Sequence, residues 1–381
     1  MELFTKIDIP ASSIRIDYTS RIAFFGSCFA DNISAQFAAR KFRVLANPFG
    51  TVYNPVSIAR QIKALADGKV FGEGDVFQDA RPRQCASGKQ DACGPWHCWG
   101  AHGSLSAPSR EECIAKLNVA ANSAREFLQQ ADTVFVTLGT SFVYYLKESG
   151  KAVANCHRQA PALFERRMIT VEEATRALES IVQDLIKIKQ DSILPPARGP
   201  GLKAEMASHF SIAQNDAHNL HIVFTVSPLR HMADGAHNNS LSKATLLLAI
   251  NSIKQKAMDS IGSTSLQNDI AEYFPSYEIV MDELRDYRFY DSDMVHLSET
   301  AKNYIFERMA DCYCDEKARV DMARVEKFMK EANHRVADMN SPATAAFAQK
   351  VISQAGDLEK SIPGLDLRLE IAKFREILNI R

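Results

Sequence analysis

A short apolar run that ends in glycine is the feature that most constrains how this chain can fold. Residues 22–25 are Ile-Ala-Phe-Phe, and Gly26 and Ser27 follow directly. An unbroken apolar run of this length is typical of a strand buried on both faces, as in a parallel sheet. Three apolar residues then recur at a spacing of four, which places them on one face of a helix. They are Phe29, Ile33 and Phe37. The sequence therefore predicts a strand that turns sharply into a helix, with Ser27 at the turn.

The alternation of strand and helix continues along the chain. Further strands are expected at 42–46, 132–138, 220–226 and, with a weaker pattern, 277–281; helices are expected at 55–66, 108–130, 171–190, 240–261 and 298–313. This alternation predicts a three-layer α/β/α fold around a roughly five-stranded parallel sheet. Residues 68–107 are irregular and rich in Gly, Pro, Cys and His, whereas residues 317–381 are charged, helical and free of strand patterns. We expect one domain over 1–316 with an irregular insertion at 68–107, and an α-helical extension over 317–381.

Charge and hydropathy exclude several functions for this chain of 381 residues. Lys and Arg total 45, and Asp and Glu total 46, so the chain has no surplus of positive charge. Neither a nucleic acid nor a membrane surface is therefore expected as a partner. No apolar run reaches the roughly 18 residues of a membrane span, and residues 1–10 lack the apolar stretch of a signal sequence. We therefore expect a cytoplasmic protein. No P-loop and no G-x-G-x-x-G motif occurs, so no cofactor is expected. The oligomeric state is not indicated.

Ser27 has two interpretations. In an open parallel sheet, ligands collect at the carboxyl ends of the strands, which is where Ser27 lies. Backbone N–H groups at the start of the next helix can receive a developing oxyanion there, so Ser27 is well placed to be a nucleophile if a base is available. Alternatively, Ser27 only caps the helix. Cys28 is a rival nucleophile because a helix N-terminus stabilises a thiolate, although a packing role is favoured for this residue.

A candidate base lies far along the chain, in residues 291–299. Asp293 and His296 are three residues apart just before the last core helix, a spacing at which one turn brings a carboxylate against imidazole Nδ1. Such a contact fixes the tautomer and leaves Nε2 free to take a serine proton. Asp291 is an alternative partner for the imidazole, and an incidental pair on a surface loop is the alternative to a catalytic one.

Three other polar clusters attract notice. Histidines are interleaved with cysteines in the irregular segment, but the C-x7-C-x4-C spacing is not a zinc pattern, so no metal site is expected. The cysteines are Cys85, Cys93 and Cys98. Asn155, His157 and Arg158 place an amide, an imidazole and a guanidinium together, a set suited to a carboxylate, a phosphate or a sugar hydroxyl. Arg230 and His231 follow an expected strand end and suit the same ligands.

Many of these residues lie in six segments that occur in the same order in a known family. The segments are Gly-Ser-Cys-Phe-Ala at 26–30, Asn-Pro-Phe-Gly-Thr-Val-Tyr-Asn-Pro at 47–55, Thr-Leu-Gly-Thr-Ser at 137–141, Asn-Cys-His-Arg at 155–158, Ser-Pro-Leu-Arg-His at 227–231, and Asp-Tyr-Arg-Phe-Tyr at 286–290 through His296. Through these segments, residues 20–315 resemble the GSCFA family, which is similar to the SGNH (GDSL-like) hydrolases. The C-terminal helical extension lies outside the resemblance.

The resemblance implies roles for individual residues. Ser27 would be the nucleophile, and Asp293 with His296 would complete a catalytic triad. His97 and His102 would lie near the mouth of the active site, where they bind substrate or simply pack a loop.

The resemblance also implies an oxyanion hole, with one departure. Gly50 would be the oxyanion glycine of the second SGNH block, acting with the N–H of Ser27. The third block normally reads Gly-x-Asn-Asp, and its asparagine donates to the oxyanion. Here residues 139–142 read Gly-Thr-Ser-Phe, so that asparagine is missing. Ser141 or Asn155 is expected to replace it.

These roles predict a serine esterase or O-acyltransferase that forms an acyl-serine intermediate on an O-acylated small molecule or glycan. One alternative is a non-catalytic carbohydrate- or metabolite-binding protein on a degenerate SGNH scaffold, which the missing asparagine suggests. A second alternative is an enzyme that uses Cys28.

Overall fold

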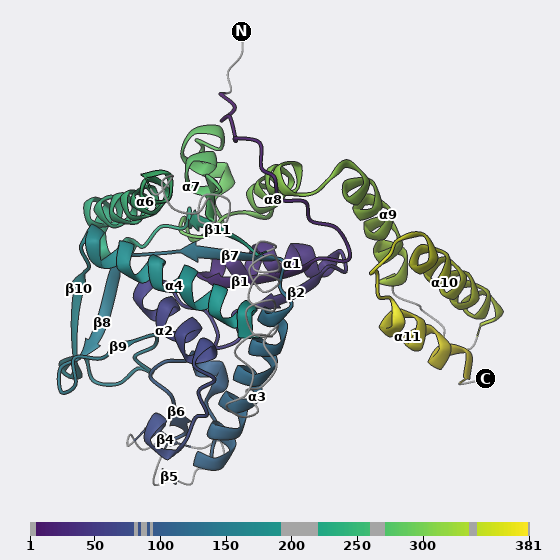
Figure 1. Cartoon of the computed structure of the whole chain (residues 1–381). Helices are drawn as coiled ribbons and strands as arrows, with labels where there is room; N and C mark the ends of the chain where they lie inside the picture. The colour runs from purple at the N-terminus through teal and green to yellow at the C-terminus, as the bar shows by residue number, and fades with distance from the viewer. Residues whose placement is uncertain are drawn as a thin grey trace, which may run out of the picture.

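Five parallel strands form the central sheet of the computed structural model (Figure 1), which describes residues 5–79, 83–84, 90–91, 94–191, 220–259, 271–334 and 341–379. The order across the sheet is β2-β1-β7-β11-β12. The strands are β1 (Arg21–Gly26), β2 (Arg43–Ala46), β7 (Thr133–Leu138), β11 (His221–Val226) and β12 (Ala271–Tyr273). In chain order this is 2-1-3-4-5, a common doubly wound arrangement. The predicted five-stranded parallel sheet is confirmed.

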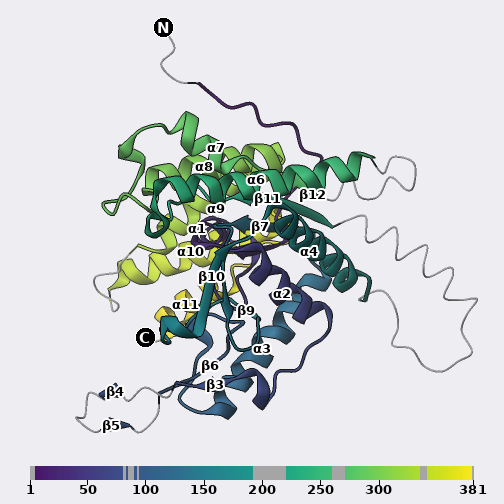
Figure 2. The ribbon, with the colours of Figure 1, turned by 90° about the vertical axis from the view of Figure 1, so that its left-hand side faces the viewer.

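Helices cover both faces of this sheet. One face carries α2 (Pro55–Ala66), α3 (Arg110–Gln129), α4 (Val171–Asp191) and α6 (Gly235–Asp259), and the other carries α1 (Cys28–Ala39) and α8 (Glu299–Tyr313). Figure 2 shows α8 above the strands, and α2 and α3 below them. The predicted α/β/α layers are therefore present. In the part of the chain that the structure describes, no helix has both the length and the apolar character needed to cross a membrane.

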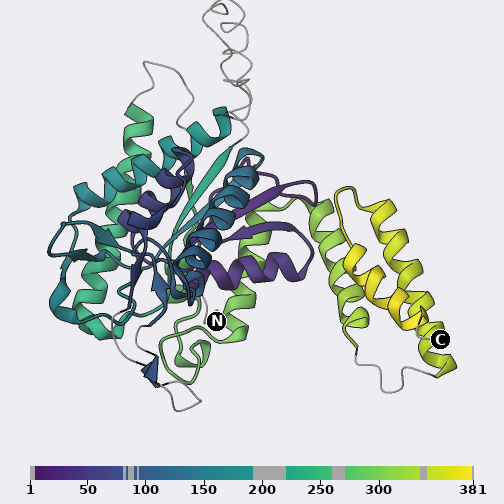
Figure 3. The same cartoon turned by 90° about the horizontal axis from the view of Figure 1, so that it is seen from below.

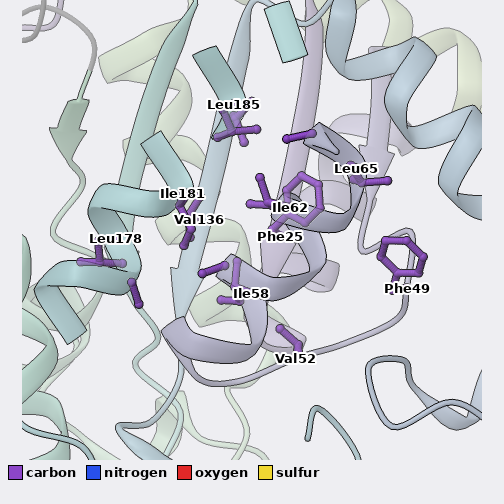
Figure 4. Packing of buried hydrophobic residues seen from close by; sticks show 14 of the residues in the cluster. Phe25, Phe49, Val52, Ile58, Ile62, Leu65, Val136, Leu178, Ile181 and Leu185 are labelled. Atoms are coloured by element: carbon purple, nitrogen blue, oxygen red, sulfur yellow. The ribbon is translucent and has the colours of Figure 1, made fainter. Parts of the chain in front are cut away.

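The apolar residues of β1 pack against the helices on both faces of the sheet. Phe25 belongs to the core on the α2 side, where Figure 4 shows it beside Ile62 and near Ile58. Phe24 belongs to the core on the α1 side and stacks on Phe135 of β7, with ring centroids 4.9 Å apart. Burial on both faces explains why residues 22–25 include no polar side chain.

The fifth strand corrects one prediction. The expected strand at 277–281 is instead helical, since α7 (Ser276–Glu278) runs into a π-helical turn (Ile279–Glu283). Ile279 and Val280 are both buried in the core on the α1 side, which a strand with alternating faces would not allow. The actual strand β12 is three residues long and only partly buried, so it lacks the apolar run that identifies the other strands.

Smaller sheets lie beside the central one. An antiparallel sheet of order β10-β8-β9 follows directly after β7 and consists of β8 (Phe142–Leu146), β9 (Ala152–Val153) and β10 (Phe164–Met168). Within 68–107, β3 (Phe77–Gln78) pairs with β6 (Trp96–His97), and β4 (Arg83–Gln84) pairs with β5 (Gln90–Asp91). Short 3-10 turns occur at Glu73–Asp75, Gly103–Leu105, Pro161–Leu163, Met232–Asp234 and Tyr287–Phe289. Residues 195–201, whose prolines and glycines predict a loop, lie outside the described residues.

The C-terminal extension consists of α9 (Glu316–Ala332), α10 (Pro342–Ser361) and α11 (Arg368–Asn379), as its composition predicts. It is attached to the far end of α1. Arg40 forms an ion pair of 3.5 Å with Glu326 of α9, and Lys41 pairs with Glu370 of α11. Since α1 has 12 residues and is therefore about 18 Å long, these contacts are remote from Ser27 at its start. Figures 1 and 3 show the three helices projecting on one side of the molecule, away from β8 and β10. Whether the extension is a separate domain stays a prediction.

Candidate active site

The strand-to-helix turn is built around Gly26 and Ser27. Gly26 has a φ of +132°, and a Cβ on it would lie 2.0 Å from the carbonyl oxygen of Thr137, so only glycine fits. The Ser27 N–H donates to that same oxygen at 3.2 Å. Ser27 Oγ accepts the N–H of Phe29 at 3.4 Å and caps α1, and the residue is 1% exposed. Ser27 is therefore a helix cap at the carboxyl edge of the sheet, which leaves its role as a nucleophile open.

A chain of side-chain hydrogen bonds holds the turn in place. Asn47 Oδ1 accepts the N–H of Gly26 at 2.8 Å, and Asn47 Nδ2 donates to Asp31 Oδ1 at 2.7 Å. Thr51 Oγ1 donates to the other carboxylate oxygen of Asp31 at 2.7 Å. The first turn of α1 and the loop after β2 are thus tied to the residue that precedes Ser27.

Asn47→Ala is expected to lower the free energy of unfolding by about 1–3 kcal/mol, because it leaves the buried N–H of Gly26 without an acceptor. Chemical denaturation measures the loss. Thr51→Val is the matched control, since it removes the other hydrogen bond to Asp31 but leaves Gly26 paired. Equal destabilisation by the two variants would contradict the importance of the Gly26 contact.

Asp293 and His296 form the expected pair. His296 Nδ1 lies 2.5 Å from Asp293 Oδ2, and Asp293 Oδ1 accepts the N–H groups of Val295 and His296 at 2.8 and 2.9 Å. The hydrogen bond from His296, together with these two backbone donors, lowers the pKa of Asp293 to about 2. The carboxylate therefore stays ionised above acid pH. Asp291 accepts instead the N–H of Ser292, so Asp293 is the partner of the imidazole.

The Asp293–His296 turn is tethered to the loop after β11. The N–H of Arg230 donates to the carbonyl of Val295 at 3.5 Å, and its guanidinium donates to the carbonyl of Met294 at 3.2 Å. That guanidinium also lies 5.7 Å from the ring centroid of Tyr290. Because β11 ends just before this loop, the turn lies at the same edge of the sheet as Ser27. In the described part of the chain, however, Ser27 Oγ bonds only to Phe29 N–H, and no hydrogen bond joins it to His296.

The imidazole that lies against Ser27 is that of His231. A Cβ added to Gly139, at the end of β7, would be 3.3 Å from both Ser27 Cβ and His231 Nε2, and 3.2 Å from the carbonyl oxygen of Tyr53. Ser27 Cβ and His231 Nε2 thus both lie close to Gly139, which has no side chain to separate them. The sequence analysis placed His231 beside Arg230 as a possible ligand-binding residue and missed its position next to Ser27. The available signal was its place just after a strand, at the edge where Ser27 lies.

The surroundings of His231 keep it neutral. Burial, and then the nearby Lys243, lower the pKa of His231 to about 4. Lys243 is itself 1% exposed, and its Nζ donates to the carbonyls of Gly139 and Ser227, each at 2.7 Å. Burial lowers the pKa of Lys243 to about 7. This lysine ties together the ends of β7 and β11 beneath the site.

The expected oxyanion donors require correction. The N–H of Ser27 is used by Thr137, and the N–H of Gly50 donates to the carbonyl of Asn47 at 2.7 Å. Ser141 is fully buried, and both its N–H and its hydroxyl donate to Ser242 Oγ, at 2.7 and 3.1 Å. The N–H of Ser27 is bonded within the central sheet, that of Gly50 within its own turn, and the donors of Ser141 to a serine of α6. These groups are therefore not free to donate to an oxyanion.

The expected substrate-binding histidines form a packed cluster of their own. The rings of His97 and His157 stack with centroids 4.4 Å apart, His97 Nδ1 lies 2.6 Å from Ser106 Oγ, and His157 Nε2 lies 2.8 Å from the carbonyl of Cys98. Burial lowers the pKa of His157 to about 4. Phe77 stacks on Trp99 in the same cluster, at 3.7 Å. These contacts assign His97 and His157 to the packing of the 68–107 segment.

Three neighbours of that cluster share its structural character. Asn155 Oδ1 accepts the N–H of His157 at 2.7 Å and so shapes the turn to Arg158, which has a φ of +56° and is exposed. His102 Nδ1 accepts the N–H of Ser104 and caps a 3-10 turn, and its Cβ would be 2.2 Å from a Cβ on Gly50. Asn155 and His102 thus make local hydrogen bonds, and the substrate and oxyanion roles expected of them stay predictions.

Cys28 does not have the properties of a nucleophile. It is half-buried and packs against the core on the α1 side. Burial, and then the carboxylate of Asp31, raise the pKa of its thiol. The favoured packing role agrees with this setting. Cys85 and Cys93 lie outside the described residues, and within those residues no three His, Cys, Asp or Glu side chains are grouped to hold a metal ion.

A groove of about 350 Å³ runs beside the Asp293–His296 turn. Its walls come from the segment after β11 and from α7 and the residues after it. Aromatic, basic and polar side chains face it, among them Arg230, Asn239, Tyr277, Arg285, Tyr287 and Tyr290. Since Arg230 lines the groove and also donates to the carbonyls of Met294 and Val295, the groove adjoins the Asp293–His296 turn.

Comparison with known proteins places the chain in a family. Neither the curated proteins nor the solved structures include a match. The GSCFA family model matches residues 21–194 and 201–309, a span that includes Ser27, His231 and the Asp293–His296 pair. Since the match covers most of the chain, the protein belongs to the GSCFA family.

Proposed function

We propose that this protein is a serine esterase or O-acyltransferase of the SGNH type. The observation that supports this best is the Asp293–His296 pair, with an ionised carboxylate 2.5 Å from Nδ1, at the edge of the sheet where Ser27 begins α1. Asp293 holds the imidazole so that Nε2 is the nitrogen able to accept a proton. A nucleophilic serine requires such a base.

The reaction follows from these roles. Ser27 Oγ attacks the carbonyl carbon of an ester while His296 Nε2 takes the hydroxyl proton. The tetrahedral intermediate then collapses, the ester C–O bond breaks, and His296 returns the proton to the leaving alcohol. An acyl-Ser27 remains. Water or the hydroxyl of an acceptor attacks it in the second half, again with His296 as the base, which gives hydrolysis or transfer.

The groove beside the turn supports a glycan or another O-acylated small molecule as the substrate. Its tyrosines offer flat faces to a sugar ring, and Arg230, Asn239 and Arg285 offer donors to hydroxyl groups. Its volume of about 350 Å³ lies within the range of small-molecule pockets. No nucleic acid, membrane or cofactor enters this proposal.

A fluorophosphonate probe tests the nucleophile directly. It phosphonylates a serine that is activated by a neighbouring base, so we expect one label per chain, located on Ser27 by peptide mapping. The label should be lost in His296→Ala. Labelling at another residue, or equal labelling of the His296 variant, would rule out this catalytic pair.

Asp293→Asn is expected to lower kcat by about 10³- to 10⁴-fold, because the amide no longer selects the productive tautomer of His296. Since the pKa of Asp293 is about 2, its carboxylate is ionised throughout the range from pH 4 to 9. A loss of wild-type activity within this range should therefore not come from protonation of Asp293. Steady-state kinetics against an aryl acetate across this range measure both effects. Asp291→Asn is the matched control and should behave as wild type.

A second candidate is a non-catalytic carbohydrate- or metabolite-binding protein on the same scaffold. The observation that favours it is the 1% exposure of Ser27, whose hydroxyl serves as the cap of α1. It predicts that Ser27 resists the fluorophosphonate while a glycan still raises the melting temperature.

A further inference from the structure

We propose that His231, as a neutral imidazole, donates a hydrogen bond from Nε2 to the oxyanion that forms when Ser27 is acylated. His231 would thereby do what the asparagine missing after Gly139 does in related sequences. This inference rests on the proposed function, because it assigns a further catalytic residue to the same reaction.

The first argument is that His231 Nε2 lacks a partner. It is shielded from solvent, and within the described residues no hydrogen bond reaches it. Buried polar atoms without a partner are rare because burial removes their hydration and nothing replaces it. A substrate oxygen bound beside Ser27 would supply the missing partner.

The second argument is position. Ser27 Cβ and His231 Nε2 each lie 3.3 Å from the point that a Cβ on Gly139 would occupy. The absence of a side chain at Gly139 therefore leaves a small space that both the serine and the imidazole nitrogen border. A carbonyl group attacked by Ser27 can direct its oxygen to this nitrogen. The edge of the Tyr53 ring, with its centroid 5.8 Å from that of His231, limits how the imidazole can turn.

The third argument is the protonation state of His231, which decides whether its imidazole acts as a hydrogen-bond donor or as a base. Four charged or titratable groups act on His231, namely Lys243, Asp234, Arg166 and His296. Asp234 favours the imidazolium, but it forms an ion pair with Arg166, whereas Lys243 and Arg166 disfavour it. With burial, these cations keep the ring neutral near pH 7. A neutral imidazole with its proton on Nε2 is a good donor and a weak base, as in other enzymes that polarise a carbonyl group this way.

The surroundings of His296 differ from those of His231 and suit a different role. His296 is half exposed and its Nδ1 is bonded to an ionised carboxylate, a setting that suits a proton acceptor. The carboxylate that acts on His231, that of Asp234, is paired with Arg166. The two histidines therefore have different surroundings, one suited to exchanging protons and the other to stabilising charge.

The test compares two substitutions in the full chain, His231→Ala and His231→Gln, with an aryl acetate as substrate. Gln places an N–H₂ donor near the position of Nε2 but cannot accept a proton. We expect His231→Ala to lower kcat by about 10²- to 10³-fold with little change in KM, and His231→Gln to stay within about tenfold of wild type. The pH profile of both variants should keep the wild-type shape.

Three outcomes would overturn the proposal. If His231→Gln is as inactive as His231→Ala, His231 acts as a base. If His231→Ala matches wild type, His231 has no part in catalysis. If wild-type Ser27 neither turns over the ester nor reacts with a fluorophosphonate, the proposed function fails, and this inference fails with it. Labelling of wild-type Ser27 thus distinguishes failure of the function from failure of the inference.

A second measurement covers the case in which His231→Ala does not fold. In wild-type protein phosphonylated on Ser27, the phosphonyl oxygen stands in for the oxyanion. We expect the proton on His231 Nε2, followed by NMR, to move downfield on phosphonylation while the ring stays neutral. An unchanged proton resonance, or a proton absent from Nε2, would overturn the proposal.

Discussion

Ser27→Ala is expected to abolish ester turnover, with a fall in kcat of at least about 10⁴-fold. The variant removes the hydroxyl that would form the acyl intermediate, and neither His296 nor the groove can replace it. Catalysis of this kind is lost almost entirely when the nucleophile of a triad is removed, leaving only what substrate binding and charge stabilisation contribute. Turnover of an aryl acetate by the purified variant, followed at saturating substrate, measures the loss.

The controls separate chemistry from folding. Ser27 Oγ also caps α1, so the alanine variant should lose about 1 kcal/mol of stability, which a melting curve detects. Cys28→Ala is the matched neighbour and should keep wild-type activity, because the thiol is protonated and packs against the core. Turnover that survives in Ser27→Ala but not in Cys28→Ala would assign the nucleophile to the thiol.

Arg308→Met is expected to lower the free energy of unfolding by about 3–5 kcal/mol, because it strands a buried carboxylate. Arg308 Nη1 lies 2.6 Å from Glu283 Oε1, and the two side chains are 9% and 0% exposed. Tyr304 Oη also donates to Glu283, and the guanidinium reaches the carbonyl of Ile7, each at 2.6 Å. Without Arg308, the buried carboxyl group of Glu283 loses the cation that pairs with it. Denaturation with urea gives the difference.

Two further variants test whether burial of the ion pair causes this loss of stability. Arg319→Met breaks a pair with Asp311 of similar length, 2.8 Å, but both side chains are largely exposed, so it should cost at most about 1 kcal/mol. Adding Glu283→Gln to Arg308→Met should recover part of the lost stability, since the stranded charge is then absent. A loss for Arg308→Met as small as that for Arg319→Met would show that water reaches Glu283.

The features that depend on neighbours in the chain were predictable. β1 and α1 follow from an apolar run, a glycine and a four-residue spacing, and Asn54 caps α2 through Ser57 N–H, as its position suggests. The contact between Asp293 and His296 spans a single turn, so its geometry could be expected from spacing. The strand at 277–281 was wrong because burial of two successive residues favours a helical turn as readily as a strand.

The features that depend on contacts between distant segments were not predictable. The place of His231 next to Ser27 requires the ends of β1, β7 and β11 to meet at Gly139. The position of His231 just after an expected strand indicates the edge of the sheet where it lies, but it does not identify Ser27 as its neighbour. The hydrogen bonds made by the expected oxyanion donors also depend on contacts between distant segments. Ser141 looks free in the sequence, but Ser242, about a hundred positions later on α6, takes both of its donors.

The attachment of the C-terminal helices has a practical consequence. α9 and α11 contact residues 40 and 41, which follow α1, whereas the groove and Ser27 lie at the other edge of the sheet. A tag, a surface or a neighbouring protein joined to α10 or α11 would therefore leave the entrance to the groove unobstructed.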